Sequence, residues 1–179
     1  MAEESNVHVK VAMADVLGLL AIAMFTFAVA GFALDFHGID LVVVIGPFVG
    51  ITVLLVAVFA YLNENLLGTA IFGPLAIFFF TIVAVGGVDA AMLCVVIGVI
   101  ILIDALLAFF QPVKILPILL IIAAIAFFVT ALWYNGETGL VDAVGWLWMI
   151  YSLLSLYMAA GIIMLVMKGK QVIPLLIKG

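Results

Sequence analysis

Charged side chains are scarce in this 179-residue chain, which has five lysines, no arginine and ten acidic residues. Charged residues make up 8% of the chain and hydrophobic residues 70%. In a typical soluble domain about 25% of the residues are charged and about 45–50% are apolar. A soluble fold of this size cannot bury so much apolar surface. The composition therefore excludes a soluble enzyme and a disordered protein. The net charge of −5 leaves no basic surface for a nucleic acid.

Residues that carry catalysis or bind metal are also few. Cys94 is the single cysteine, so no internal disulfide can form. The two histidines, His8 and His37, have no second ligand at metal-binding spacing. No glycine-rich phosphate loop, nucleophile elbow or Cys–His pair is present. The sequence thus predicts a protein that is not an enzyme and has no metal or cofactor.

The abundant feature is long apolar runs, each near the roughly 20 residues that a membrane-spanning helix needs. Short segments of turn-forming residues separate them, such as Asn63-Glu64-Asn65 and Gln111-Pro112-Val113-Lys114. The sequence predicts an all-α, polytopic membrane bundle of six antiparallel transmembrane helices. The runs extend from near Val11 to Phe32, Leu41 to Leu62, Leu66 to Val85, Ala90 to Phe110, Ile115 to Tyr134 and Val144 to Met167.

The lysines predict the orientation of this bundle, because cytoplasmic loops carry an excess of positive charge. With six crossings, all the lysines fall on one side and the acidic loop residues Asp35, Asp40, Asp89, Glu137 and Asp142 on the other. We expect a multi-pass protein of the cell membrane with a cytoplasmic tail at 1–10, a transmembrane domain at 11–167 and a second cytoplasmic tail at 168–179. An aromatic belt is expected at the outer interface, from Trp133, Tyr134, Trp146 and Trp148.

Two glycine–proline pairs interrupt the apolar runs, Gly46-Pro47 in the second and Gly73-Pro74 in the third. Proline removes a helical hydrogen bond, and the freed groups must be buried in protein or face a cavity. Two interpretations remain open: a simple packing kink, or a break that lines a pore. In the second case the candidates to offer hydrogen bonds to a solute are Asn65, Gly68, Thr69, Gly73 and Pro74.

Asn65 stands at the start of the third run, followed by Leu66-Leu67-Gly68. Asparagine is a favourable N-cap because its side-chain oxygen accepts a hydrogen bond from a free backbone N–H. Gly46 and Gly50 form a GxxxG pattern, and Ala159, Ala160 and Gly161 place small residues on the sixth run. Small residues permit close helix contact within a bundle or between subunits, and the sequence does not choose between these.

Two acidic residues lie within apolar runs. Asp104 is inside the fourth run, and Gln111, seven residues later on the same helix face, could partner it. An intramembrane acid is a functional candidate by default. Asp15 lies at the start of the first run, where a negative charge also suits the helix dipole. Either residue could carry a proton.

Several of these segments are similar to the acetate uptake transporter family, also called the succinate–acetate permease family. Asn65-x-x-Gly68 resembles the family's Asn-Thr-Phe-Gly segment, and Leu17-Gly18-Leu19 resembles the end of its Asn-Pro-x-Pro-Leu-Gly-Leu signature. Met13-Ala14-Asp15-Val16 replaces the first half of that signature. The sixth run matches more fully, with Gly145-Trp146, then Tyr157-x-Ala159-x-Gly161, then Gly169-Lys170-x-x-x-Pro174.

The resemblance implies a homo-oligomer, a hexamer, with a transport path through each protomer. It implies that apolar side chains constrict the path at Ile22, Leu75 and Ile122, and that Ser155 stands where the family tunes substrate size. The implied substrate is a small carboxylate, acetate or succinate, and the implied surroundings are the lipid bilayer.

Three functions follow from this reading. The first is a transporter or channel for a small monocarboxylate, linked to protons, because no lysine or arginine lies within the apolar runs to pair with an anion. The second is a channel for a small neutral solute such as urea, ammonia or water, since apolar constrictions resist free ions. The third is a membrane subunit that transports nothing.

Overall fold

The computed structural model describes the backbone of residues 4–175 and the side chains of residues 14–175. Among these residues the chain forms six α-helices and one short 3₁₀ turn, with no strand. The helices are α1 (Glu4–Ala33), α2 (Asp40–Leu62), α3 (Leu66–Ile82), α4 (Gly87–Ala108), α5 (Ile115–Tyr134) and α6 (Val141–Lys168), with η1 (Thr138–Leu140) before the last. The all-α prediction of six helices is confirmed.

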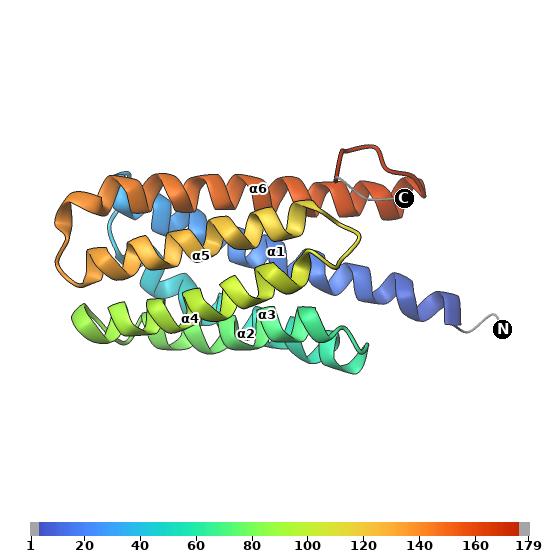
Figure 1. Ribbon diagram of the computed structural model, residues 1–179, viewed down its shortest axis with the longest axis horizontal. Coiled ribbons are helices and arrows are strands. Elements are labelled where there is room, and N and C mark those ends of the chain that lie inside the picture. Colours follow the sequence, from blue (N-terminus) through green and yellow to red (C-terminus); the bar gives the residue numbers. More distant parts are fainter. Residues whose placement is uncertain (1–3, 176–179) are drawn as a thin grey trace.

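The six helices form a closed ring. Each packs against the next in the chain, and α6 packs extensively against α1, which closes the ring. The helices run along the long axis of the molecule, and both described chain ends lie at one end of it (Figure 1). The α2–α3 and α4–α5 connections lie at this terminal end, and the other three connections lie at the opposite, loop end. The ring thus surrounds an axis that leads from one end of the bundle to the other.

Helix lengths agree with a membrane-spanning bundle. Five helices are long and apolar enough to cross a membrane, and the shorter α3 has 17 residues, which is at the lower limit for a span. The fifth run was predicted residue for residue as Ile115–Tyr134. α3 ends three residues before the predicted Val85, at Ile82. The chain is a multi-pass membrane protein.

The predicted N-terminal tail at 1–10 is helical from Glu4 onward, because α1 begins there. Residues 1–3 lie outside the described residues. α2 and α3 each continue through their internal proline, Pro47 and Pro74, as a single helix. Both helices therefore keep the backbone on either side of the proline helical.

Small residues mediate helix contacts inside this one chain. A Cβ at Gly46 would lie 2.6 Å from the side chain of Val83, and one at Gly145 would lie 2.6 Å from Leu34. The glycines therefore let α2 approach the end of α3, and let α6 approach the end of α1. Gly50 packs on Phe80 in the same way, so the GxxxG pattern on α2 serves packing against α3.

The segment after α6 folds back along that helix. Gly169 ends α6 in the left-handed conformation at φ 64°, which glycine adopts at little cost. Tyr157 Oη then donates a hydrogen bond of 2.8 Å to the Pro174 carbonyl oxygen. Leu175 is fully buried, with its side chain in the space left by Gly161. We define residues 169–175 as the C-terminal strap; residues 176–179 of the predicted tail lie outside the described residues.

The expected aromatic belt requires a correction. Trp148 is only 5% exposed and lies inside the bundle, where its indole Nε1 donates to Thr130 Oγ1 at 3.0 Å. Trp146, two residues earlier on α6, is 58% exposed. The prediction was wrong for Trp148 because residues two positions apart lie on nearly opposite faces of a helix, one toward the ring interior and one toward the exterior, and both faces of α6 are apolar.

Candidate transport path

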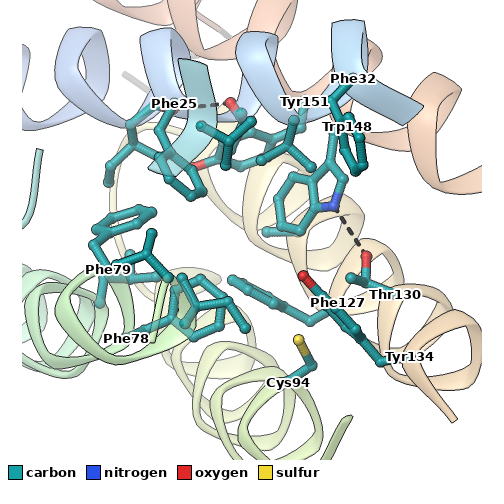
Figure 2. Close-up of a pocket in the computed structure, with 18 of the residues that line it drawn as sticks. Phe25, Phe32, Phe78, Phe79, Cys94, Phe127, Thr130, Tyr134, Trp148 and Tyr151 are labelled. Carbon is teal, nitrogen blue, oxygen red and sulfur yellow. Dashed lines mark hydrogen bonds between the residues drawn. The ribbon is translucent and has the colours of Figure 1, made fainter. Parts of the chain in front are cut away.

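The larger cavity occupies the half of the bundle nearer the loop end and has a volume of about 320 Å³. A single water needs only about 10–15 Å³ of such volume, so the cavity can hold a small organic molecule. Figure 2 shows that its walls are dominated by aromatic rings. We call it the aromatic cavity, after the lining residues Phe25, Phe32, Phe78, Phe79, Phe127, Trp133, Tyr134, Trp148 and Tyr151.

These rings pack edge to face in a chain that crosses four helices. The centroids of Phe25 on α1 and Phe79 on α3 lie 4.8 Å apart, and those of Phe78 and Phe127 lie 5.0 Å apart. Phe127 on α5 then meets Trp148 on α6 at 4.8 Å. Edge-to-face pairs at this range are favourable beyond the area they bury. The wall of the aromatic cavity is therefore a rigid, mutually supported surface.

Polar groups at this cavity are mostly engaged with protein partners. Thr26 Oγ1 is hydrogen bonded to Ser152 Oγ at 2.7 Å and donates to the Ile22 carbonyl oxygen at 2.9 Å. Thr130 Oγ1 accepts from Trp148 and lies 2.7 Å from the Ala126 carbonyl oxygen that it donates to. The cavity therefore offers a solute an apolar wall with a few hydroxyl groups.

The smaller cavity lies toward the terminal end and has a volume of about 180 Å³. Its lining includes Asp15 from α1, Asn65 and Gly68 from the start of α3, and Gln111 from the α4–α5 connection. We call it the Asp15 cavity. Unlike the aromatic cavity, it contains a carboxyl group and two side-chain amides.

Asn65 joins α1 to α3 at this cavity. Its Oδ1 accepts from the Gly68 backbone N–H at 2.9 Å, which confirms the predicted N-cap. Its Nδ2 donates to the Asp15 carboxylate at 3.2 Å. A Cβ at Gly68 would lie 2.6 Å from Asn65 Nδ2, so a glycine here leaves room for the capping side chain. The local sequence of α3 thus positions an amide against the carboxyl group of α1.

The two cavities meet at a neck formed by side chains that line both of them: Ile22, Leu120 and Tyr151. All three are at least 95% buried. Leu75, on α3, lines the aromatic cavity alone and is 3% exposed. The neck brings together α1, α5 and α6.

The other residues singled out in the sequence lie away from the cavity walls. Ile122 lines neither cavity, and Leu120, two residues earlier on α5, stands at the neck instead. Ser155 is fully buried, and its Oγ donates to the Leu19 carbonyl oxygen at 3.0 Å, joining α6 to α1. The cavity linings also omit Thr69, Gly73 and Pro74, and Thr69 Oγ1 donates to the Asn65 carbonyl oxygen at 3.0 Å.

Asp104 is buried in α4, where it is 3% exposed, but it lines neither cavity. Within the described part of the chain, no donor reaches its Oδ2. Gln111, which we considered as its partner, lines the Asp15 cavity, and no hydrogen bond joins the two among the described residues. Asp104 is thus a buried acid away from both cavities, and Asp15 is an acid that lines one of them.

Sequence reasoning missed Leu120, Tyr151 and Trp148. Leu120 is one of many leucines in an apolar helix, and nothing in the local sequence sets it apart. For Trp148 and Tyr151 a signal existed, since a tryptophan followed three residues later by a tyrosine places two amphipathic rings on one helix face.

A closed ring of apolar helices around two cavities that share a neck defines a multi-pass membrane bundle with a candidate axial path. A solved structure of the bacterial acetate channel SatP has the same fold, with a TM-score of 0.85 over 90% of this chain and 97% of that chain, at 19% identity. The likeness agrees with the six-helix membrane bundle that the sequence predicts. No protein-family model matches the chain, and no curated protein matches it.

Proposed function

We propose that this protein is a channel or transporter that moves a small monocarboxylate such as acetate through each protomer, linked to protons. The observation that carries the proposal is the pair of cavities that share the Ile22–Leu120–Tyr151 neck inside the helix ring. The likeness to a bacterial acetate channel supports the choice of solute.

The chemistry of the path favours passage of the uncharged acid. No lysine whose side chain is described lines either cavity, and the chain has no arginine. Lys114 is engaged at the end of α4, where its Nζ donates to the Phe109 and Gln111 carbonyl oxygens at 2.6 Å and 2.8 Å. An anion in an apolar path without a cationic partner is costly. The neutral acid avoids this cost and carries one proton with each molecule.

Asp15 and Asp104 are the two candidates to bind a coupling proton. Asp15 is the stronger one because its carboxyl group lines the path and touches Asn65. Asp104 would bind the proton while buried in α4, away from both cavities. Lys114 follows α4, Lys168 is the last residue of α6 and Lys170 follows it. Both helices end at the terminal end of the bundle (Figure 1), which supports a cytoplasmic position for both termini.

Uptake of labelled acetate by protein reconstituted in lipid vesicles tests the proposal. We expect faster uptake than in protein-free vesicles when the external solution is acidic, and we expect the difference to shrink when an ionophore collapses the pH gradient. Uptake equal to that of protein-free vesicles would reject transport of acetate. Native mass spectrometry in detergent tests the hexamer that the family resemblance implies.

A second candidate function is permeation of a small neutral solute such as urea or water. The apolar lining, and the absence of lysine among the described residues that line the two cavities, favour it. Stopped-flow swelling of the same vesicles in urea distinguishes the two functions, because urea permeation would not depend on the pH gradient.

A further inference from the structure

Tyr151 holds a position in the neck that no other polar side chain shares. It lines both cavities together with Ile22 and Leu120, which are purely hydrocarbon. Figure 2 shows its side chain reaching from α6 into the cavity. A solute that moves between the two cavities must therefore pass the phenol of Tyr151.

The hydroxyl of Tyr151 has no protein partner among the residues that the structure describes, although the residue is only 4% exposed. The sole described side-chain atom that is both unpartnered and closed to solvent is Asp104 Oδ2, so the Tyr151 hydroxyl opens onto the cavity. A buried hydroxyl is normally paired with protein or water. This one is left available to water or to a passing solute.

The ring that carries this hydroxyl is firmly held. Trp148 packs on it edge to face, with centroids 5.7 Å apart and an interplanar angle of 84°. Trp148 is itself fixed by its hydrogen bond to Thr130 and by its edge contact with Phe127. A polar group held by packing and by supporting hydrogen bonds is preorganised for its ligand.

We propose that Tyr151 is the specificity-determining residue of the path, and that its hydroxyl hydrogen bonds to each solute molecule in the neck. This inference rests on the proposed function for the identity of the solute. An uncharged carboxylic acid has a carbonyl oxygen that accepts from the phenol and an O–H that donates to it. An apolar solute of the same size leaves the hydroxyl unpaired and is disfavoured.

The variant Tyr151→Phe tests this role because it removes the hydroxyl and keeps the ring that packs on Trp148. We expect acetate uptake into vesicles to fall by about 2- to 10-fold, the range that the loss of one hydrogen bond predicts. The matched control is Tyr61→Phe, which removes a hydroxyl from a residue that is 68% exposed on α2, and it should leave uptake unchanged. Equal uptake by wild type and Tyr151→Phe, at equal protein content, would overturn the inference.

A second variant covers the case in which Tyr151→Phe fails to fold. Thr130→Val removes the acceptor of Trp148 and keeps the phenol, so Thr130 acts as a positioning residue. We expect a raised KM for acetate with a smaller change in the maximal rate, because the hydroxyl is present but less well placed. An unchanged KM in this variant would contradict the inference.

Failure of the proposed function gives a different result from failure of this inference. If wild-type protein does not carry acetate, the same variants are compared by stopped-flow swelling in urea and in water. A slower rate for Tyr151→Phe with either solute supports the role of the hydroxyl in the neck. An unchanged rate with both, or no permeation of any solute by wild type, overturns it.

Discussion

The aromatic cavity and the Asp15 cavity lie on the same axis but are lined by different kinds of side chain. The aromatic cavity is the larger, about 320 Å³ against about 180 Å³, and edge-to-face ring contacts fix its walls. The Asp15 cavity is lined by a carboxyl group and the amides of Asn65 and Gln111. One half of the proposed path is apolar and rigid, and the other half carries a titratable group.

This difference assigns separate tasks to the two halves. A rigid apolar wall discriminates solutes by size and shape, because packed aromatic rings yield little. A carboxyl group in a confined space responds to pH and repels anions. Changes in the aromatic cavity should therefore alter which solutes pass, and changes in the Asp15 cavity should alter how passage depends on pH.

The largest effect is expected where the two cavities meet. In Ile22→Trp, the added ring fills the neck, and acetate uptake should fall to the level of protein-free vesicles. The matched control is Met24→Trp, two residues along α1, where the side chain is 55% exposed and faces away from the ring interior. Uptake by Ile22→Trp at the wild-type rate, with Met24→Trp also unchanged, would show that the path does not pass Ile22.

A large effect on acetate uptake is expected from chemical modification of Cys94, which lines the aromatic cavity only. Its thiol belongs to the chain's single cysteine and lines the aromatic cavity, where Figure 2 shows the sulfur directed into the space. Methyl methanethiosulfonate should add a thiomethyl group there and slow acetate uptake several-fold, whereas Cys94→Ser should resist the reagent. The adduct is quantified by intact-protein mass spectrometry. Complete modification without any change in uptake would separate the aromatic cavity from the path.

The sequence predicted the architecture well because membrane spans are defined by length and composition, which can be read without tertiary contacts. The turn residues around Asn63 and Gln111 set the ends of the helices, and Asn65 was recognised as a cap from local chemistry alone. The start of α1 at Glu4 was missed because the polar residues before Val11 carry no stop signal for a helix.

The candidate site was harder to predict because the helices are apolar on every face. In a soluble protein, the polar face of a helix reveals which residues point inward. Here lipid and ring interior are both apolar, so Leu120 could not be distinguished from Ile122, nor an inward Trp148 from an interfacial one. Ser155 looked available for a solute, but its hydroxyl is used by the Leu19 carbonyl oxygen, a contact between residues far apart in sequence.

A moderate effect is expected from Asp15→Asn, which removes the charge from the Asp15 cavity. Uptake at neutral pH should rise about two- to fivefold, because the Asp15 carboxylate, partly screened by water, repels the acetate anion by about 1 kcal/mol or less before the anion takes up the proton with which it crosses the neck. Uptake at acidic pH should change little, so the ratio of acidic to neutral uptake should fall.

Asp104→Asn serves as the comparison for Asp15→Asn, because Asp104 is also an aspartate but lines neither cavity. We expect it to keep the wild-type ratio of acidic to neutral uptake. If Asp104→Asn flattened the pH dependence of uptake and Asp15→Asn did not, the coupling proton would bind to Asp104 on α4. The Asp15 cavity would then not set the pH dependence.

The smallest effect on transport is expected from the C-terminal strap, which packs on α6 beside the wall of the Asp15 cavity. Tyr157 and Gly161 hold the strap, and the neighbouring Met158 and Ile162 line that cavity. Leu175→Ala removes a fully buried side chain and should lower the free energy of unfolding by about 2 kcal/mol, measured as a lower Tm in detergent. Val172→Ala, on the exposed part of the strap, is the matched control and should leave the Tm unchanged.

The same variant also tests whether the two cavities are independent. None of Tyr157, Gly161 and Leu175 lines the aromatic cavity, so Leu175→Ala should keep the wild-type reactivity of Cys94. A faster thiol reaction in this variant would show that the two cavities respond together.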